Sequence, residues 1–230
     1  MRIRIVTEGA LPRYKALMTL RHTLLALPLV LLAACGPAKK DEASAPPSAE
    51  LETKAPVTVA IAPYAGGPLK IGKDGVGPIN GSTAFDLTTL KALFPKAKVE
   101  SAFLHAGQGP ALPIINVEQD NVPLLEIGKG DEGQIGYVRA AAGDVRGPKD
   151  EQLLAKWADL GFTLDQCRAG EGREVNQTIC VRPEAPTVSY VFGVPGWTGK
   201  GLPAETALKA KGQLNELVWR PAEGAVVGAA

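Results

Sequence analysis

Short strand-like segments follow one another along most of this sequence, and this order predicts an α+β fold with antiparallel sheets. The signal is an alternation of apolar and polar residues between turns rich in Gly, Pro and Asn. The expected strands lie at 69–71, 99–104, 114–118, 122–127, 134–140, 162–166, 177–181, 188–192 and 214–219. Because few helices separate these segments, neighbouring strands are expected to pair with each other as antiparallel hairpins.

Two segments have helical periodicity. Ser82 or Thr83 can cap a helix that ends near Phe94. Residues 150–160 are expected to form a second helix. The apolar face of the second helix comprises Leu153, Leu154, Trp157 and Leu160. Each helix follows a Gly-Pro turn and precedes a series of strands, so the sequence suggests a degenerate internal duplication.

The N-terminal part of the sequence has the features of a secretory signal. Basic residues up to Arg21 precede an apolar segment, 23–34, and Cys35 follows it. Leu-Ala-Ala-Cys resembles the lipobox of bacterial lipoproteins, in which the Cys thiol is acylated and the chain is cut before it. A transmembrane helix needs about 20 apolar residues, whereas this segment is shorter and contains Pro28. Cys35 is therefore the expected lipidation site, which implies palmitate or a similar acyl chain.

These observations divide the chain into four parts. Residues 1–34 are the lipoprotein signal peptide, and residues 35–56 are the lipidated Cys with a disordered tether rich in Ala, Pro and Lys. Residues 57–221 are expected to form a single α+β domain, long enough to bury a core. Residues 222–230 are expected to be a disordered tail.

Charge and composition exclude some functions. The whole chain has a net charge of +1, but residues 1–34 hold five basic residues and one acidic residue, so the mature chain is near −3. Binding to nucleic acid requires a basic face, and no nucleic-acid partner is expected. The mature chain keeps one histidine, His105, which leaves too few soft ligands for a metal cluster.

Cys167 and Cys180 remain once Cys35 is acylated. In an exported protein such a pair is expected to form a disulfide, although two free buried thiols are the alternative. The bridge would close a Gly-rich, charged loop and stabilise the fold by roughly 3 kcal/mol in the chain-entropy model.

Several motifs that suggest chemistry have simpler structural explanations. Gly128, Gly130 and Gly133 have the spacing of a dinucleotide-binding loop, but a strand is expected after them, so a hairpin turn is favoured. Residues 193–201 contain Gly-Lys without the rest of a P-loop. His105 has no Ser or Cys partner nearby, so a surface loop is expected.

The acidic residues Glu118, Asp120 and Glu126 alternate with apolar residues, which is typical of the solvated face of a sheet. No residue is assigned to catalysis, and no cofactor or metal is expected. The protein is therefore predicted not to be an enzyme. A hydrolase with a carboxylate pair is the least favoured alternative.

Trp197 is the best candidate for a ligand contact. It lies among glycines in the loop 195–203, where an indole either packs on the core as a plug or meets a ligand. The plug, with the indole beside Leu202, is the favoured interpretation. Trp157 and Trp219 are expected in the core.

Short motifs follow one another in order over roughly residues 70–220. They are Gly75-Val76-Gly77, Cys167 and Cys180 around a charged insert, Val188-Ser189-Tyr190-Val191-Phe192, Trp197-x-Gly199 before Leu202-Pro203, and Leu217-Val218-Trp219-Arg220. In order and spacing they resemble the RpoE-regulated lipoprotein family of bacterial envelope lipoproteins. The resemblance implies expression under envelope stress through the sigma-E response, and it supplies no catalytic residue.

The sequence thus favours a non-enzymatic envelope lipoprotein that is anchored in the bacterial outer membrane and faces the periplasm. Gly36, where the enterobacterial sorting rule would place Asp for inner-membrane retention, favours the outer membrane. The expected role is envelope maintenance or a stress-related interaction with an envelope protein or glycan. The alternative is a small-ligand or glycan-binding module that uses the Trp197 loop.

Overall fold

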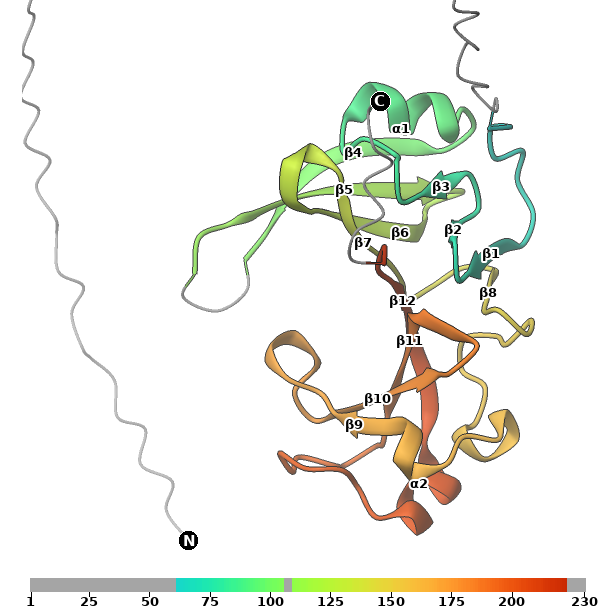
Figure 1. Ribbon diagram of the computed structural model, residues 1–230, viewed down its shortest axis with the longest axis vertical. Coiled ribbons are helices and arrows are strands. Elements are labelled where there is room, and N and C mark those ends of the chain that lie inside the picture. Colours follow the sequence, from blue (N-terminus) through green and yellow to red (C-terminus); the bar gives the residue numbers. More distant parts are fainter. Residues whose placement is uncertain (1–60, 106–108, 223–230) are drawn as a thin grey trace, which may run out of the picture. The chain divides into compact units, whose positions relative to one another are not determined.

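The computed structural model describes residues 61–105 and 109–222 (Figure 1). The predicted signal peptide, Cys35, the whole predicted tether and nearly all of the tail lie outside the described residues. Within the described part, two α-helices and two mostly antiparallel sheets confirm the predicted α+β class. No helix in that part is long and apolar enough to cross a membrane.

The larger sheet has eight strands in the order β4-β5-β6-β7-β12-β11-β10-β9, and every neighbouring pair is antiparallel. Its strands are β4 (Lys98–Leu104), β5 (Leu112–Gln119), β6 (Val122–Lys129), β7 (Ile135–Ala140), β9 (Cys167–Ala169), β10 (Gln177–Arg182), β11 (Ala185–Gly193) and β12 (Gln213–Trp219). Strand neighbours in the sheet are neighbours in sequence, except where β12 pairs with β7. The predicted internal duplication stays a hypothesis.

The smaller sheet has the order β3-β2-β1-β8. Its strands are β1 (Leu69–Gly72), β2 (Gly75–Val76), β3 (Ile79–Asn80) and β8 (Val145–Arg146). Strands β1 and β8 are parallel. Gly77 makes the turn from β2 to β3 with a φ of +51°, and a side chain there would collide with Leu69.

One face of the larger sheet forms the core. A row of cross-strand partners runs over five adjacent strands, from β5 to β11. The row consists of Ile115, Ile127, Val138, Trp219 and Val188, and each is at most 2% exposed. Trp157 is also buried, so both tryptophans expected in the core are confirmed there.

The first helix, α1 (Leu87–Leu93), begins later than predicted. Asp86 caps it, because its Oδ1 accepts the backbone N–H of Thr89 at 2.8 Å. Ser82 and Thr83, the expected caps, instead belong to a turn closed by Asn80.

Residues 150–160 do not form the predicted helix. Leu154 has a φ of +68°, which an α-helix does not tolerate. Its N–H donates to the Leu214 carbonyl at 2.7 Å instead of to a helical partner. Only a short 3₁₀ turn, η2 (Trp157–Leu160), remains. The chain here runs antiparallel to the first residues of β12, and Leu154 is 68% exposed rather than part of an apolar stripe.

Residues 162–166 do not form the predicted strand. A 3₁₀ turn, η3 (Leu164–Gln166), leads into β9. The side-chain oxygen of Gln166 accepts the N–H of Thr163 at 3.1 Å, and this local bond favours the turn over an extended strand.

The helix α2 (Glu205–Lys211) was not predicted. The sequence does carry its signals, since Pro203 precedes it, Glu205 occupies its first turn, and Lys209 and Lys211 occupy its last turn. With seven residues and one buried leucine, Leu208, it is too short to give a clear periodic pattern.

Candidate functional site

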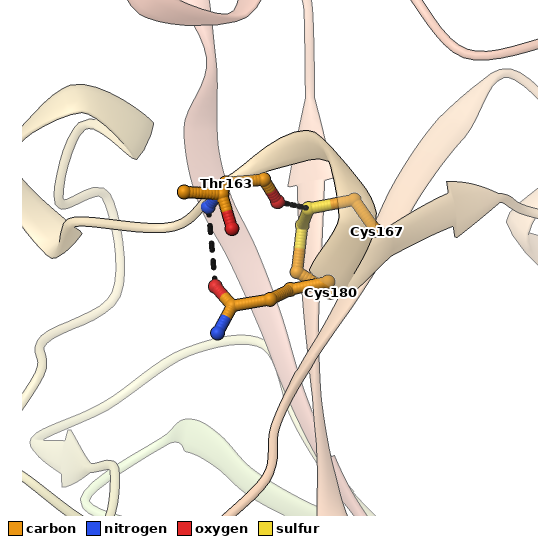
Figure 2. Close-up of a disulfide and its surroundings, with 4 residues drawn as sticks. Thr163, Cys167 and Cys180 are labelled. Atoms are coloured by element: carbon orange, nitrogen blue, oxygen red, sulfur yellow. Dashed lines mark hydrogen bonds between the residues drawn. A yellow bond between two sulfur atoms is a disulfide. The ribbon is translucent and has the colours of Figure 1, made fainter.

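A disulfide joins Cys167 in β9 to Cys180 in β10, which confirms the predicted bridge (Figure 2). The two residues are direct cross-strand partners, and their Cα atoms lie 4.0 Å apart. We call the chain between them, residues 168–179, the disulfide loop. It contains a 3₁₀ turn, η4 (Gly172–Glu174), and the bridge holds its two ends together.

Thr163 lies beside the disulfide (Figure 2). Its carbonyl oxygen is 3.4 Å from the Cys167 sulfur. Cys180 on the other side is fully buried in the core. The bridge therefore links the turn η3 to the core, as well as closing the loop.

The disulfide loop carries Glu174 to the face of the larger sheet that is opposite the core. There Arg139 of β7 forms ion pairs with Glu174 and with Glu216 of β12. Glu126 Oε1 of β6 lies 3.9 Å from the Arg139 Nε. We call these four residues the charge cluster. The Arg139 side chain is only 6% exposed, so its charge is withdrawn from water and depends on the three carboxylates.

The charge cluster alters the pKa values of neighbouring groups. Burial raises the pKa of the Glu174 carboxyl, but the hydrogen bond and charge of Arg139 outweigh burial, so this pKa lies below its ordinary value. Burial and the nearby Glu126 raise the pKa of Tyr137 to about 12. The Tyr137 hydroxyl donates to Glu126 Oε1 at 3.0 Å. At neutral pH Glu174 is therefore ionised and Tyr137 is a neutral donor.

A pocket of about 220 Å³ opens beside the charge cluster, lined by Asn116, Glu118, Glu126, Arg139 and Arg173 among others. The guanidinium of Arg173, from the disulfide loop, donates to Glu126. This hydrogen bond raises the pKa of Arg173. The pocket has donors and acceptors suited to a small polar molecule, yet Arg139 and Arg173 are already paired with Glu126.

A second buried ion pair stabilises the segment before β9. Glu151 Oε1 accepts hydrogen bonds from Arg182 Nε and the Tyr190 hydroxyl, both at 3.0 Å. The Arg182 guanidinium also lies 4.2 Å from the centre of the Phe162 ring, within cation–π range. Burial and the Glu151 charge raise the pKa of Tyr190 far above its ordinary range. The side chains of Glu151, Arg182 and Tyr190 are hydrogen-bonded to one another. This arrangement therefore stabilises the local fold.

A groove of about 700 Å³ lies along β1, β2 and β3. Buried Ile79 and Ala185 line it together with exposed Lys70 and Lys149. Each lysine is paired with a carboxylate, Lys70 with Asp150 at 3.1 Å. The groove therefore presents a mixed surface of apolar side chains and charges of both signs.

Trp197 contacts its own loop rather than the core. The indole lies against Gly199, where an added Cβ would come 2.4 Å from the ring. Trp197 is partly buried and is not among the side chains packed on the core. The side-chain amide of Asn176, from the disulfide loop, lies 3.0 Å from the Thr198 carbonyl, to which it can donate when its nitrogen faces that oxygen. The structure thus differs from the predicted plug, and the indole instead closes a loop that touches the disulfide loop.

The remaining predicted positions are at the surface, with one exception. His105 and Asp120 are exposed, and Glu118 is partly exposed. Glu126 does not lie on a solvated face, because it belongs to the charge cluster. The predicted hairpin turn between β6 and β7 is confirmed, although it spans residues 130–134 because Gly128 and Lys129 still belong to β6. Within the described residues, no three His, Cys, Asp or Glu side chains are grouped to hold a metal.

The hairpin of β4 and β5 exposes apolar side chains at one end. Phe103 is 68% exposed and Leu112 is 48% exposed. Phe103 pairs with Pro113, and Leu104 pairs with Leu112. The pairing of β5 with β6 begins only at Ile114, and the hairpin of β4 and β5 extends beyond β6 at this end (Figure 1). We call Phe103, Leu104, Leu112 and Pro113 the apolar arm.

These features define a disulfide-closed α+β domain with an eight-stranded antiparallel sheet. The chain belongs to the family described as protein of unknown function (DUF1131), whose model matches residues 58–221. It is also similar to the crystal structure of the uncharacterized protein yfeY from Escherichia coli, with a TM-score of 0.55 and 20% identity over 66% of this chain and 99% of that chain. At this identity the likeness shows the fold alone. No curated protein matches the chain.

Sequence patterns alone did not identify the charge cluster. Its signal is a charged residue within an otherwise apolar strand, namely Arg139 after Tyr137-Val138 and Glu126 after Leu124-Leu125. Such a charge is either solvated or paired across the sheet, and the register that pairs Glu126 with Arg139 comes only from the structure.

Proposed function

We propose that this protein is a lipid-anchored envelope protein that acts by binding and not by catalysis. The observation that carries this proposal is the Cys167–Cys180 disulfide in a domain that follows a lipobox. Disulfides persist in oxidising compartments such as the periplasm, which fits an exported chain. The acylated residue is Cys35, and Gly36 after it favours the outer membrane with the domain facing the periplasm.

The buried charged side chains bind one another, and this supports a role without catalysis. A catalytic acid or base must reach a substrate from a cleft. Arg139 is bound by Glu174 and Glu216, and Glu151 is bound by Arg182 and Tyr190. These charged side chains hold loops against the sheet. Their hydrogen-bonding groups therefore stabilise the fold and are not free to act on a substrate.

The partner that we propose is an envelope protein or glycan, and the role is envelope maintenance. Expression under sigma-E control, which the sequence resemblance implies, belongs to the same proposal. A rise in the transcript after envelope damage, lost when sigma-E is absent, is the expected result.

The experiment that tests the anchor is metabolic acyl labelling of the full chain and of Cys35→Ser. The wild-type chain should be labelled, processed and recovered in the outer-membrane fraction, and Cys35→Ser should be unlabelled and unprocessed. Cys167→Ser with Cys180→Ser is the matched control, because it also removes thiols but should keep the label. Normal labelling of Cys35→Ser would refute the anchor.

The second candidate is a ligand or glycan module at the Trp197 loop. The observation that favours it is the buried indole N–H, which has no hydrogen-bond partner within the described residues and could donate to a ligand after a small loop movement. Trp197 fluorescence should then respond to envelope glycans. No response of a protein that has Trp157→Phe and Trp219→Phe, and therefore only the Trp197 signal, would exclude this candidate.

A further inference from the structure

We propose that the apolar arm inserts into the lipid surface to which the chain is anchored. The proposal rests on the proposed anchor at Cys35, since that anchor keeps the domain close to a membrane. The occupant of the arm is therefore lipid, and the role of the arm is to orient the domain on the bilayer.

The first argument is the distribution of side chains around the arm. Successive residues of a strand point to opposite faces, so the Phe103–Pro113 pair lies on one face and the Leu104–Leu112 pair on the other. A docking surface for a protein needs only one apolar face. An arm that is apolar on both faces suits a medium that surrounds it, as lipid does.

The second argument is the absence of charge. No Lys, Arg, Asp or Glu occurs between Glu100 and Glu118, in a chain of which 21% of residues are charged. Charged side chains are strongly unfavourable in lipid. The apolar arm can therefore enter the interfacial region without removing a Lys, Arg, Asp or Glu charge from water.

The third argument concerns the open edge of β4. This strand is the edge of the larger sheet, and a free edge is a site for pairing with another chain. Lys98 and Glu100 stand exposed along it and bind each other at 2.9 Å. Charged residues on an edge oppose pairing with another strand. The edge of β4 is therefore protected from pairing at Lys98 and Glu100, whereas the apolar arm beyond these residues carries no such charge.

The dimensions agree with this placement. The flexible tether that the sequence predicts, residues 35–56, would span roughly 25 Å on average. The seven residues of β4 extend over about 23 Å. The anchor therefore leaves the domain within reach of the membrane that the arm would enter.

The experiment uses the mature acylated chain in phosphatidylethanolamine–phosphatidylglycerol vesicles. An environment-sensitive dye is attached at Leu112→Cys in the arm, and at Leu154→Cys in the matched control. Leu154 is also an exposed leucine, at 68%, but lies outside the arm. At position 112 the emission should shift to the blue and be quenched by nitroxide-labelled lipid, and at position 154 neither change should occur.

A third protein, Leu112→Cys with Phe103→Ser, tests whether the phenyl ring drives insertion. The ratio of inserted to free arm should fall at least about tenfold. Transfer of a phenyl ring out of water favours insertion by more than a factor of ten in the equilibrium constant. Flotation of the same samples separates the two proposals. Protein that does not float with the vesicles would contradict the anchor, whereas protein that floats without a shift at position 112 would contradict the arm alone.

Two further outcomes would also overturn the arm proposal. A shift that appears without vesicles and grows with protein concentration would assign the arm to a second copy of this chain. A shift that requires an added envelope protein fraction would assign it to a protein partner.

Discussion

Replacement of Arg139 by methionine tests whether the charge cluster holds the disulfide loop on the sheet. Arg139→Met keeps much of the side-chain length but leaves Glu126, Glu174 and Glu216 without their shared cation. The three carboxylate side chains are between 13% and 18% exposed, so they are poorly solvated. Removal of one partner from a buried ion pair costs about 3–5 kcal/mol.

The free energy of unfolding should fall by that amount in urea. For a domain of this size, it corresponds to a decrease in Tm of about 6–20 °C. Trp157 and Trp219 are buried, so their fluorescence reports global unfolding. Arg173→Met is the matched control. Its side chain is 38% exposed, and loss of an exposed pair changes stability by about 1 kcal/mol at most.

Addition of Glu174→Gln to Arg139→Met should restore part of the lost stability, because one uncompensated carboxylate is removed. Arg139→Met within 1 kcal/mol of the wild type would refute the reasoning, as would a double variant less stable than Arg139→Met. Either result would mean that water or another cation already compensates the carboxylates.

Three further predictions concern the same region. Reduction of the Cys167–Cys180 bridge should lower the free energy of unfolding by about 2–4 kcal/mol, and alkylation of unreduced protein should modify neither thiol. The lowered pKa of Glu174 stabilises the fold above the ordinary Glu pKa of 4.5, and this contribution is lost as the pH falls through the folded pKa. Acid titration should therefore show a shallower loss below pH 4.5 in Glu174→Gln than in the wild type. Trp197→Ala should cost about 1–2 kcal/mol, since full burial of an aromatic side chain contributes about 1.5–3 kcal/mol and the indole is only partly buried, and a loss above 3 kcal/mol in a thermal melt would restore the plug interpretation.

Much of the fold could be predicted because strand alternation is a local property. Strands β4 to β7 and β10 to β12 could be predicted from the pattern of apolar residues within each segment. The errors arise where tertiary contacts override such a pattern. Residues 150–160 have a helical stripe, but Leu154 bonds to Leu214 and adopts a left-handed conformation, and no short-range rule contains that contact.

The candidate sites were less predictable for a related reason. Cys167 and Cys180 could be paired from the sequence because the predicted acylation of Cys35 leaves each of them only one partner. Arg139 had many possible partners, and its ion pairs depend on the register of β6, β7 and β12 together with the fold of the disulfide loop. A pairing that joins four separate segments has no signal in any one of them.

The disulfide and the charge cluster act on the same loop from different sides. The bridge fixes the two ends of residues 168–179, whereas Glu174 and Arg173 bind its centre to Arg139 and Glu126. The bridge shortens the range that the loop explores, so it raises the effective concentration of Glu174 at Arg139. The two contributions should therefore be coupled: reduction should cost less in Arg139→Met than in the wild type. If reduction lowers the free energy of unfolding equally in the two proteins, the bridge stabilises the strand pair β9–β10 and does not affect the ion pairs of the disulfide loop.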